Sequence, residues 1–379
     1  MSEKQRYEQL VRRYLENKAS DDELNVFFDL LKEGKIQPVL QEALEKEEEK
    51  TLSGIARNHT EESAVVVRIS RWKRIAGAAV VTGLLLGAGI TYWVRKPHQA
   101  PVVARGAYYS GDVRPGRNHA LLTLASGKVI DLDTNSAPQL VLQSNAKLVK
   151  NKAGQWVYHS PPGDSDAEVY NTISAPRGGQ FPFVLEDGTK VWLNAASSLR
   201  FPVVFHGPSR EVTLDGEAYF DVAPNAKSTF QVHAAGMTVD VLGTSFNLNA
   251  YPDESVIRTT LIHGAVRVTG GQTSALLQPG EQASFRPDGT VRTVKDPEVV
   301  DAAVAWRNGY FSFDEDDIQT VMRQIARWYN VDVRYEGPVT RATFGGDMER
   351  DLTLVQVLQV LEKSQVHFRL EGNTLTVLP

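Results

Sequence analysis

The sequence predicts a multidomain protein with a small all-α head, one transmembrane helix, an all-β region and a C-terminal α+β domain. Helical periodicity is found near the N-terminus, a charge-free apolar run follows it, and most of the remaining chain consists of short β-favouring segments separated by Gly and Pro. The predicted boundaries are 1–73 for the head, 75–94 for the transmembrane helix, 102–294 for the β-region and 305–379 for the C-terminal domain.

The composition excludes several kinds of chemistry. The chain has 379 residues, of which 42% are hydrophobic, and its formal net charge of -5 provides no global basic field for nucleic acid. It has no cysteine, which excludes disulfides, thiolate zinc sites and cysteine nucleophiles. The 8 histidines lack the i, i+3 or i, i+4 spacing of a helical metal pair. We therefore expect no metal, no cofactor, no enzymatic activity and no direct contact with nucleic acid.

Two amphipathic helices are predicted in the head. Apolar residues recur at helical spacing over 7–14, and again over 24–31 after a capping box at 20–23. A third helix is predicted from 36 through 44. The second apolar stripe either forms the core of a small bundle or in part docks a partner protein. This stripe consists of Leu24, Phe27, Phe28 and Leu31.

The run from Ile75 to Val94 predicts the transmembrane helix. It contains 20 residues and no charge, and at about 1.5 Å per residue it spans the roughly 30 Å hydrocarbon core of a bilayer. Basic and aromatic anchors flank both ends. Four Lys or Arg residues precede the run closely and three follow it, so charge does not set the orientation. A buried core helix is the alternative interpretation.

The β-region contains one internal repeat. Residues 115–132 align without gaps on 176–193 and share the pattern Leu-x-x-Gly-x-x-Val/Ile-x-Leu. The repeat predicts two related hairpins that turn at Ser126–Gly127 and Asp187–Gly188. Repeated short strands of this kind fit a sandwich or a short β-solenoid, and the sequence does not choose between them.

Past a polar linker predicted around 295–301, the pattern changes to β-α-β-β-α-β-β, which describes a small α+β domain. A capping box at 353–356 precedes its second helix. The acidic run 314–317 lacks the spacing of an EF-hand loop and precedes the first helix. We interpret it as an acidic helix N-terminus rather than a calcium site.

Gly243–Thr244 is a candidate self-cleavage site. A threonine hydroxyl held over the preceding carbonyl can attack it in an N-to-O acyl shift, which replaces the amide bond by an ester that water then hydrolyses. Glycine has no side chain to shield that carbonyl. The alternative is that Gly243 forms a bulge or tight turn and that Thr244 is a strand residue. No catalytic triad, phosphate-binding loop or paired-carboxylate motif stands out, so no catalytic residue acting on a substrate is predicted.

Five segments of the β-region and the C-terminal domain have a distinctive sequence. They are SAPRGGQFPFVLEDGTKVWLNAASSLRFPVVF (174–205), REVTLDGEAYFDV (210–222), DVLGTSFNLNAY (240–251), AWRNGYFSF (305–313) and ARWYNVDVRYEG (326–337). In these segments the chain resembles the FecR-type regulators of the Bacteroidetes kind, over about residues 105–379 and in the same order as in the family. The resemblance implies a transmembrane anti-sigma factor whose last domain has the fold of secretin and TonB-receptor N-termini.

The resemblance also implies the location, the orientation and the partners. It implies a single-pass protein of the cell inner membrane, with a cytoplasmic head that binds an extracytoplasmic-function sigma factor and a periplasmic C-terminal part. That part would receive a signal from the N-terminal extension of a TonB-dependent outer-membrane receptor, and membrane proteases would then release the head. A membrane-anchored periplasmic glycan-binding or scaffold protein is the alternative function, whereas a membrane-tethered hydrolase has no support from motifs.

Overall fold

A computed structural model describes most of the chain outside the predicted membrane segment. The described residues are 3–15, 18–32, 35–43, 109–132, 139–141, 147–151, 155–159, 169–338 and 340–379. The transmembrane helix predicted at 75–94 lies outside them. Within these ranges, no helix combines the length and the apolar character needed to cross a membrane.

The head contains the predicted helices. They are α1 (Glu3–Leu15), α2 (Asp21–Lys32) and a helical stretch at 37–43. The capping box before α2 is present, because Glu23 N donates to Ser20 Oγ (3.4 Å) and Ser20 N donates to Glu23 Oε2 (2.8 Å). Tyr14 of α1 stacks on Phe27 of α2 with a distance of 4.2 Å between ring centroids. The prediction of helices in the head is therefore confirmed.

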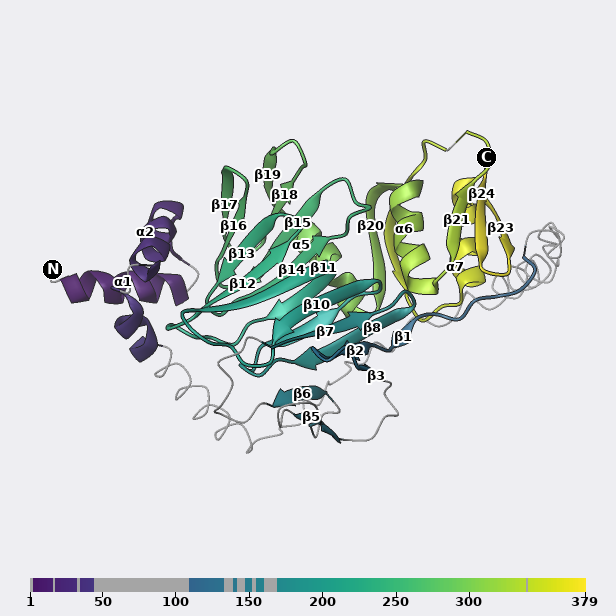
Figure 1. Cartoon of the computed structure of the whole chain (residues 1–379). Coiled ribbons are helices and arrows are strands. Elements are labelled where there is room, and N and C mark those ends of the chain that lie inside the picture. The colour runs from purple at the N-terminus through teal and green to yellow at the C-terminus, as the bar shows by residue number, and fades with distance from the viewer. Residues whose placement is uncertain are drawn as a thin grey trace, which may run out of the picture. The chain divides into compact units, whose positions relative to one another are not determined.

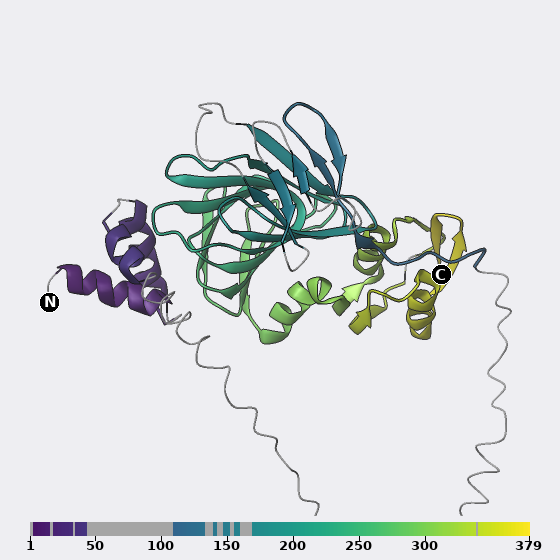
Figure 2. The same ribbon diagram turned by 90° about the horizontal axis from the view of Figure 1, so that it is seen from below.

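The β-region is a two-layered sandwich in which a single long strand belongs to both layers (Figures 1 and 2). This strand, β11 (Ser209–Asp221), pairs with β10 and β12 through its first half and with β9 and β14 through its second half. The first layer has the order β3 (Val129–Asp131), β2 (Leu121–Thr123), β7 (Tyr170–Ala175), β10 (Ser197–Pro202), β11, β12 (Thr229–Ala234), β13 (Met237–Val241), β16 (Val266–Gly270), β17 (Thr273–Leu277). The second has the order β4 (Gln139–Val141), β5 (Lys147–Lys150), β6 (Trp156–His159), β8 (Gly179–Val184), β9 (Lys190–Leu193), β11, β14 (Ser245–Ala250), β15 (Ile257–His263), β18 (Glu281–Phe285), β19 (Val291–Lys295).

Aromatic side chains from both layers fill the space between them. Phe183 of β8 lies 5.9 Å from Phe201 of β10, and Phe220 of β11 lies 6.1 Å from Phe230 of β12, measured between ring centroids. All four are buried, and they belong to one continuous apolar core. Of the two folds that the sequence left open, the structure has the sandwich.

The two hairpins of the internal repeat are confirmed. Strands β2 and β3 form the first, and β8 and β9 form the second. Gly127 and Gly188 have φ angles of 82° and 87°, a left-handed conformation that glycine adopts without steric cost. A short additional strand, β1 (Arg117–Asn118), pairs in parallel with β8.

The interval predicted as a polar linker contains a helix, so that prediction was wrong. Helix α5 (Pro297–Ala305) begins after Asp296, whose side chain accepts a hydrogen bond from Glu298 N at 2.9 Å. Proline at the first helical position is compatible with a helix, since its missing N–H has no intrahelical partner there. None of its residues is buried, so the helix lacks the strong apolar stripe that would have predicted it.

The C-terminal domain has the predicted order of elements. They are β20 (Tyr310–Asp317), α6 (Ile318–Tyr329), β21 (Asp332–Tyr335), β22 (Thr343–Glu349), α7 (Leu354–Leu361), β23 (His367–Glu371) and β24 (Thr374–Leu378). Strands β20 and β22 form one small sheet, and β21, β24 and β23 form another. The apolar faces of α6 and α7 pack into a second core that is separate from the core of the sandwich.

Candidate signalling site

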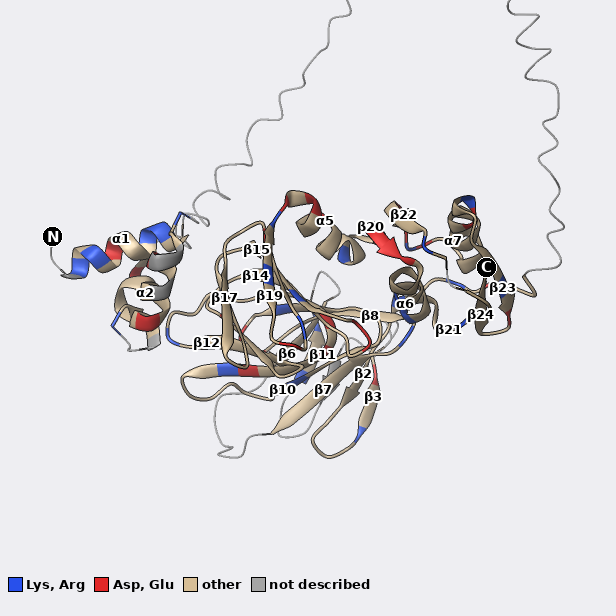
Figure 3. Cartoon of the chain, turned by 90° about the horizontal axis from the view of Figure 1, so that it is seen from above, with Lys and Arg blue, Asp and Glu red and all other residues tan. Residues whose placement is uncertain are grey.

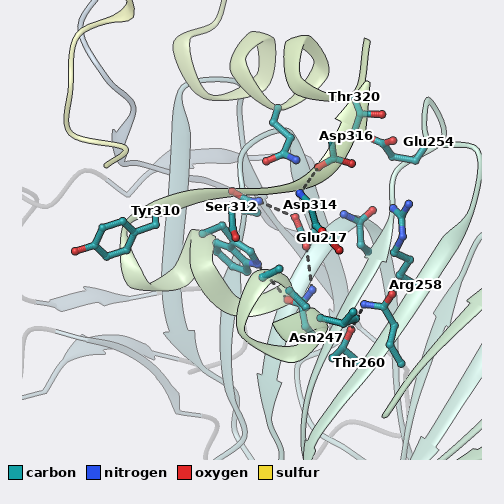
Figure 4. A pocket seen from close by; sticks show the side chains of 18 of the residues that line it. Glu217, Asn247, Glu254, Arg258, Thr260, Tyr310, Ser312, Asp314, Asp316 and Thr320 are labelled. Carbon is teal, nitrogen blue, oxygen red and sulfur yellow. Dashed lines mark hydrogen bonds between the residues drawn. The ribbon is translucent and has the colours of Figure 1, made fainter. Parts of the chain in front are cut away.

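A buried polar network lies where the β-region meets the C-terminal domain (Figure 4). At its centre is Glu217 of β11, which is only 7% exposed. Its carboxylate accepts hydrogen bonds from Nδ2 of Asn194 (2.7 Å) and Nδ2 of Asn247 (2.9 Å). Trp306 Nε1 in turn donates to Asn247 Oδ1 at 3.1 Å. Each of these side chains therefore has a polar partner, as burial requires.

Arg350 extends the network into the C-terminal domain. Its guanidinium donates to Asn194 Oδ1 and to the Trp306 carbonyl, both at 3.1 Å, and lies 3.9 Å from the centroid of the Trp328 ring. Burial lowers the pKa of Arg350 to about 10, so the side chain is still charged at neutral pH. Asn194 therefore bridges Arg350 of the C-terminal domain and Glu217 of the β-region, since it accepts from the first and donates to the second.

A cluster of ion pairs links α6 to the loop that follows β14. Arg327 Nη2 donates to Glu254 Oε1 at 2.8 Å, and Arg323 Nη2 donates to Glu254 Oε2 at 2.7 Å. Arg327 also pairs with Asp253 and lies 3.8 Å from the centroid of the Tyr251 ring. The Arg327–Glu254 pair is screened little by solvent, because these side chains are only 10% and 6% exposed, whereas Asp253 is 55% exposed.

A cavity of about 250 Å³ opens beside the network. Most of its lining is polar, and both domains contribute to it (Figure 4). Labelled lining residues include Arg258 and Thr260 from the β-region and Ser312 and Asp316 from the C-terminal domain. Side chains that line a cavity make fewer van der Waals contacts than closely packed ones. On this side of the junction, hydrogen bonds and ion pairs therefore join the two domains.

The protonation state of Glu217 should make the stability of the protein depend on pH. Burial raises the pKa of Glu217 from its ordinary value of 4.5, partly offset by its two asparagine donors. A raised pKa stabilises the fold fully below pH 4.5, and this contribution is lost as the pH rises through the raised value. Wild type should therefore gain unfolding free energy relative to Glu217→Gln as the pH falls from 7 toward 5. Denaturant titrations at several pH values measure this difference, and a constant difference would contradict the prediction.

The acidic run lies at the end of β20, which is red in Figure 3, and its last residue is the N-cap of α6. Asp317 Oδ1 accepts a hydrogen bond from Thr320 N at 2.7 Å, and this bond lowers the pKa of Asp317. In the part of the chain that the structure describes, no group of three His, Cys, Asp or Glu residues could hold a metal ion.

Gly243 and Thr244 lie between β13 and β14, outside the polar network. Thr244 is 2% exposed, and its Oγ1 donates to the Ala265 carbonyl at 3.0 Å. A Cβ on Gly243 would lie 2.8 Å from Pro224 Cα, and one on Gly264 would lie 2.7 Å from Thr244 Oγ1. Close packing therefore accounts for both glycines, and the hydroxyl has a structural partner. Self-cleavage at this bond stays a prediction.

Electrophoresis of the purified protein tests self-cleavage directly. If the Gly243–Thr244 bond is cleaved, wild type and Thr244→Ser should yield two fragments whose junction mass spectrometry assigns to this bond. Thr244→Ala should stay full-length, since it lacks the attacking hydroxyl. Identical full-length bands for wild type and Thr244→Ala, without fragments, would sink the prediction.

The apolar stripe predicted to bind a partner is buried. Leu24, Phe27, Phe28 and Leu31 all lie in the apolar cluster that contains the head helices. By contrast, Val26 on the same helix is 51% exposed. The sequence did not single out Val26 as a candidate contact residue. Its place outside the apolar stripe of the helix is the signal that could have identified it.

Known protein families match both domains that form the junction. A family model described as FecR protein matches residues 171–267, and one described as FecR, C-terminal matches residues 310–377. The first match contains Glu217 and its asparagine partners, and the second contains Arg327 and Arg350. No curated protein is significantly similar to the chain.

Two crystal structures of a candidate anti-sigma factor from Parabacteroides distasonis ATCC 8503, at 1.65 and 2.50 Å resolution, are similar to the chain. Both are 27% identical to it. The first comparison covers 54% of this chain and 97% of that one with a TM-score of 0.51. The second covers 55% and 98% with a TM-score of 0.52.

Proposed function

The chain belongs to the FecR family, and from this we propose that it is an anti-sigma regulator that carries a signal across a membrane. The observation that carries the proposal is the match of both domains that form the polar junction to FecR models. The likeness to a candidate anti-sigma factor supports the same function. In this proposal, the head at 1–73 binds an extracytoplasmic-function sigma factor.

The proposed topology has residues 75–94 crossing the inner membrane once. The head is then cytoplasmic, and the β-region and C-terminal domain are periplasmic. The length and the lack of charge of this run support a membrane crossing. The orientation is part of the proposal and follows from a sigma factor being a cytoplasmic partner.

The proposed signal enters at the C-terminal domain. The N-terminal extension of a TonB-dependent outer-membrane receptor contacts residues 310–379, and the polar junction around Glu217 and Arg350 passes the change to the β-region. Membrane proteases then cleave near the membrane and release the head with its sigma factor. A complex in which the receptor extension contacts only residues 97–290 would contradict this route.

Co-purification of the full-length protein with the extracytoplasmic-function sigma factors of the same organism tests the proposal. Val26→Asp should abolish or strongly weaken the complex, because it puts a charge on an apolar residue that is exposed on α2. Gln9→Asp, on the exposed part of α1, is the matched control and should bind like wild type. Phe27→Asp cannot separate binding from folding, because Phe27 is fully buried.

The possible results of this experiment lead to different conclusions. Loss of the complex in Val26→Asp with unchanged helix content would place the contact on the outer surface of α2. A complex that survives in Val26→Asp would move the contact elsewhere on the head. No complex with wild type would refute the anti-sigma function and favour the membrane-anchored scaffold.

A further inference from the structure

A short segment between the predicted membrane helix and the β-region is fastened to the C-terminal domain. This segment, Tyr109–Val113, is named the strap, and it begins where the blue ribbon emerges from the grey trace in Figure 1. Tyr109 forms a parallel bridge with Leu370 of β23, and Ser110 N donates to the Leu370 carbonyl at 2.9 Å. Tyr109 OH donates to Glu362 Oε1 at 2.8 Å. The strap thus behaves as a short additional strand on the outer edge of β23.

The other end of the strap caps α7. The Val113 carbonyl accepts a hydrogen bond from Leu354 N at 3.0 Å, and Asp112 Oδ1 accepts one from Val355 N, also at 3.0 Å. These two N–H groups belong to the first turn of α7, where the helix itself offers no acceptor. A carboxylate at this end is also favoured by the helix dipole. A distant part of the chain therefore completes the helix.

The strap packs against the C-terminal domain and leads directly into the β-region. Tyr109 and Val113 pack against the core of the C-terminal domain. Three residues after the strap, the backbone of Gly116 lies so close to Trp328 that an added Cβ would be 2.6 Å from the ring. The chain then enters β1 of the sandwich. From Tyr109 to Gly116, the described chain therefore runs along the C-terminal domain before it enters the β-region.

The strap leaves part of the β23 edge without a partner among the described residues. The backbone N–H and C=O groups of successive strand residues point to opposite edges, so residues two apart point to the same edge. Because the Leu370 carbonyl faces the strap, the N–H and C=O of Phe368 face that edge too. No described residue outside the strands donates to or accepts from the Phe368 backbone. An extended peptide that pairs with the whole of β23 would also engage the N–H and C=O of Phe368, which no described residue engages.

We propose that an extended peptide of the receptor pairs in parallel with β23, displaces the strap and thereby frees the chain next to the membrane for proteolysis. The strap itself indicates the chemistry of this peptide, which should carry an aromatic hydroxyl group and, three residues later, a carboxylate. The identity of the partner rests on the proposed function. The binding edge and the displaced segment rest on the contacts of Tyr109, Ser110 and Asp112.

A peptide with the sequence of the strap tests the displacement. The probe is GAYYSGDVRP, which corresponds to residues 106–115, added to the full-length protein in nanodiscs. Amide hydrogen exchange of residues 109–113 should accelerate about tenfold at saturating peptide, because the Ser110 N–H loses its acceptor. Leu354 and Val355 should stay protected, since the bound peptide supplies the same acceptors. A scrambled peptide should change nothing.

Loosening the strap by mutation gives an independent test. Asp112→Ala removes the acceptor for Val355 N, so exchange in the first turn of α7 should accelerate about fivefold to tenfold. Trypsin should also cut faster after Arg105, the basic residue that precedes the strap. Asp301→Ala replaces an exposed aspartate on α5 and is the matched control.

The results separate this inference from the proposed function. If GAYYSGDVRP leaves the exchange of 109–113 unchanged in both wild type and Asp112→Ala, strap displacement is overturned, whatever the head binds. If the peptide displaces the strap but the head binds no sigma factor, the anti-sigma function fails and the displaceable strap remains. Faster exchange without faster cleavage after Arg105 would overturn the proposed link to proteolysis.

Discussion

Replacing Arg210 by methionine should lower the free energy of unfolding of the β-region by about 3–5 kcal/mol, the usual effect of breaking a buried ion pair. Arg210 is 2% exposed, and its Nη1 donates to Asp187 Oδ2 at 2.7 Å and to the Ala223 carbonyl at 2.9 Å. Nε and Nη2 donate to the Ser228 carbonyl at 3.2 and 3.0 Å. Methionine fills a similar volume but cannot donate a hydrogen bond. The Asp187 carboxylate then loses its cation and keeps only the Thr189 donors, and the Ala223 and Ser228 carbonyls lose their arginine donors.

Denaturant unfolding of the purified protein measures this effect. Arg292→Met on β19 is the matched control, because it replaces an exposed arginine of the same sandwich, and it should stay within about 0.5 kcal/mol of wild type. Asp187→Asn combined with Arg210→Met should be less destabilised than Arg210→Met alone, since the stranded charge is removed. An Arg210→Met protein as stable as the control would show that the pair contributes little.

Replacing Arg350 by methionine should weaken the docking of the C-terminal domain on the β-region by about 2–3 kcal/mol. The variant loses the hydrogen bonds to Asn194 and to the Trp306 carbonyl, and it loses the stacking of a cation on Trp328. Glu217 also loses a favourable charge in its surroundings, because Arg350 acts to lower its pKa. The pKa of Glu217 should consequently rise further in this variant.

Hydrogen exchange locates the effect of Arg350→Met. Protection should fall at the residues of the junction, whereas the sandwich core around Phe220 and Phe230 should stay protected. Arg341→Met, an exposed residue of the same domain, is the matched control. Uniform loss of protection in both domains would mean that Arg350 stabilises the whole fold rather than the junction.

Local rules of sequence predicted much of this fold correctly. The capping box before α2 and the glycine turns of the two hairpins depend on residues within a few positions of one another. The same applies to the apolar faces of α6 and α7 and to the cap at Asp317. Helix α5 escaped prediction because it buries no residue and therefore shows no apolar stripe.

The candidate site could not be predicted in this way, and β11 shows why. In its first half, buried and exposed residues alternate, as in a strand with one solvated face. From Gly216 to Phe220 every residue is buried. This half of the strand lies beside the junction, where the C-terminal domain covers the second face of the sheet. Glu217 lies in this segment, and nothing in its neighbours along the chain distinguishes it from an exposed strand carboxylate.

The sequence by itself determined the division of the chain into parts, the apolar run of 75–94, the order of elements in the C-terminal domain and the likeness to FecR proteins. These depend on periodicity, turns and length, which act between near neighbours in the chain. Only the tertiary structure shows that the β-region is a sandwich and not a solenoid. It also shows that Arg350 bonds Asn194, 156 positions away, and that the strap pairs with β23. Asp187 shows both cases. Its turn was predictable from the sequence, whereas its ion pair with Arg210 appears only in the tertiary structure. The physical reason is that hydrogen bonds and charge pairs between distant residues form wherever the packed elements bring them together, and no spacing along the chain encodes that position.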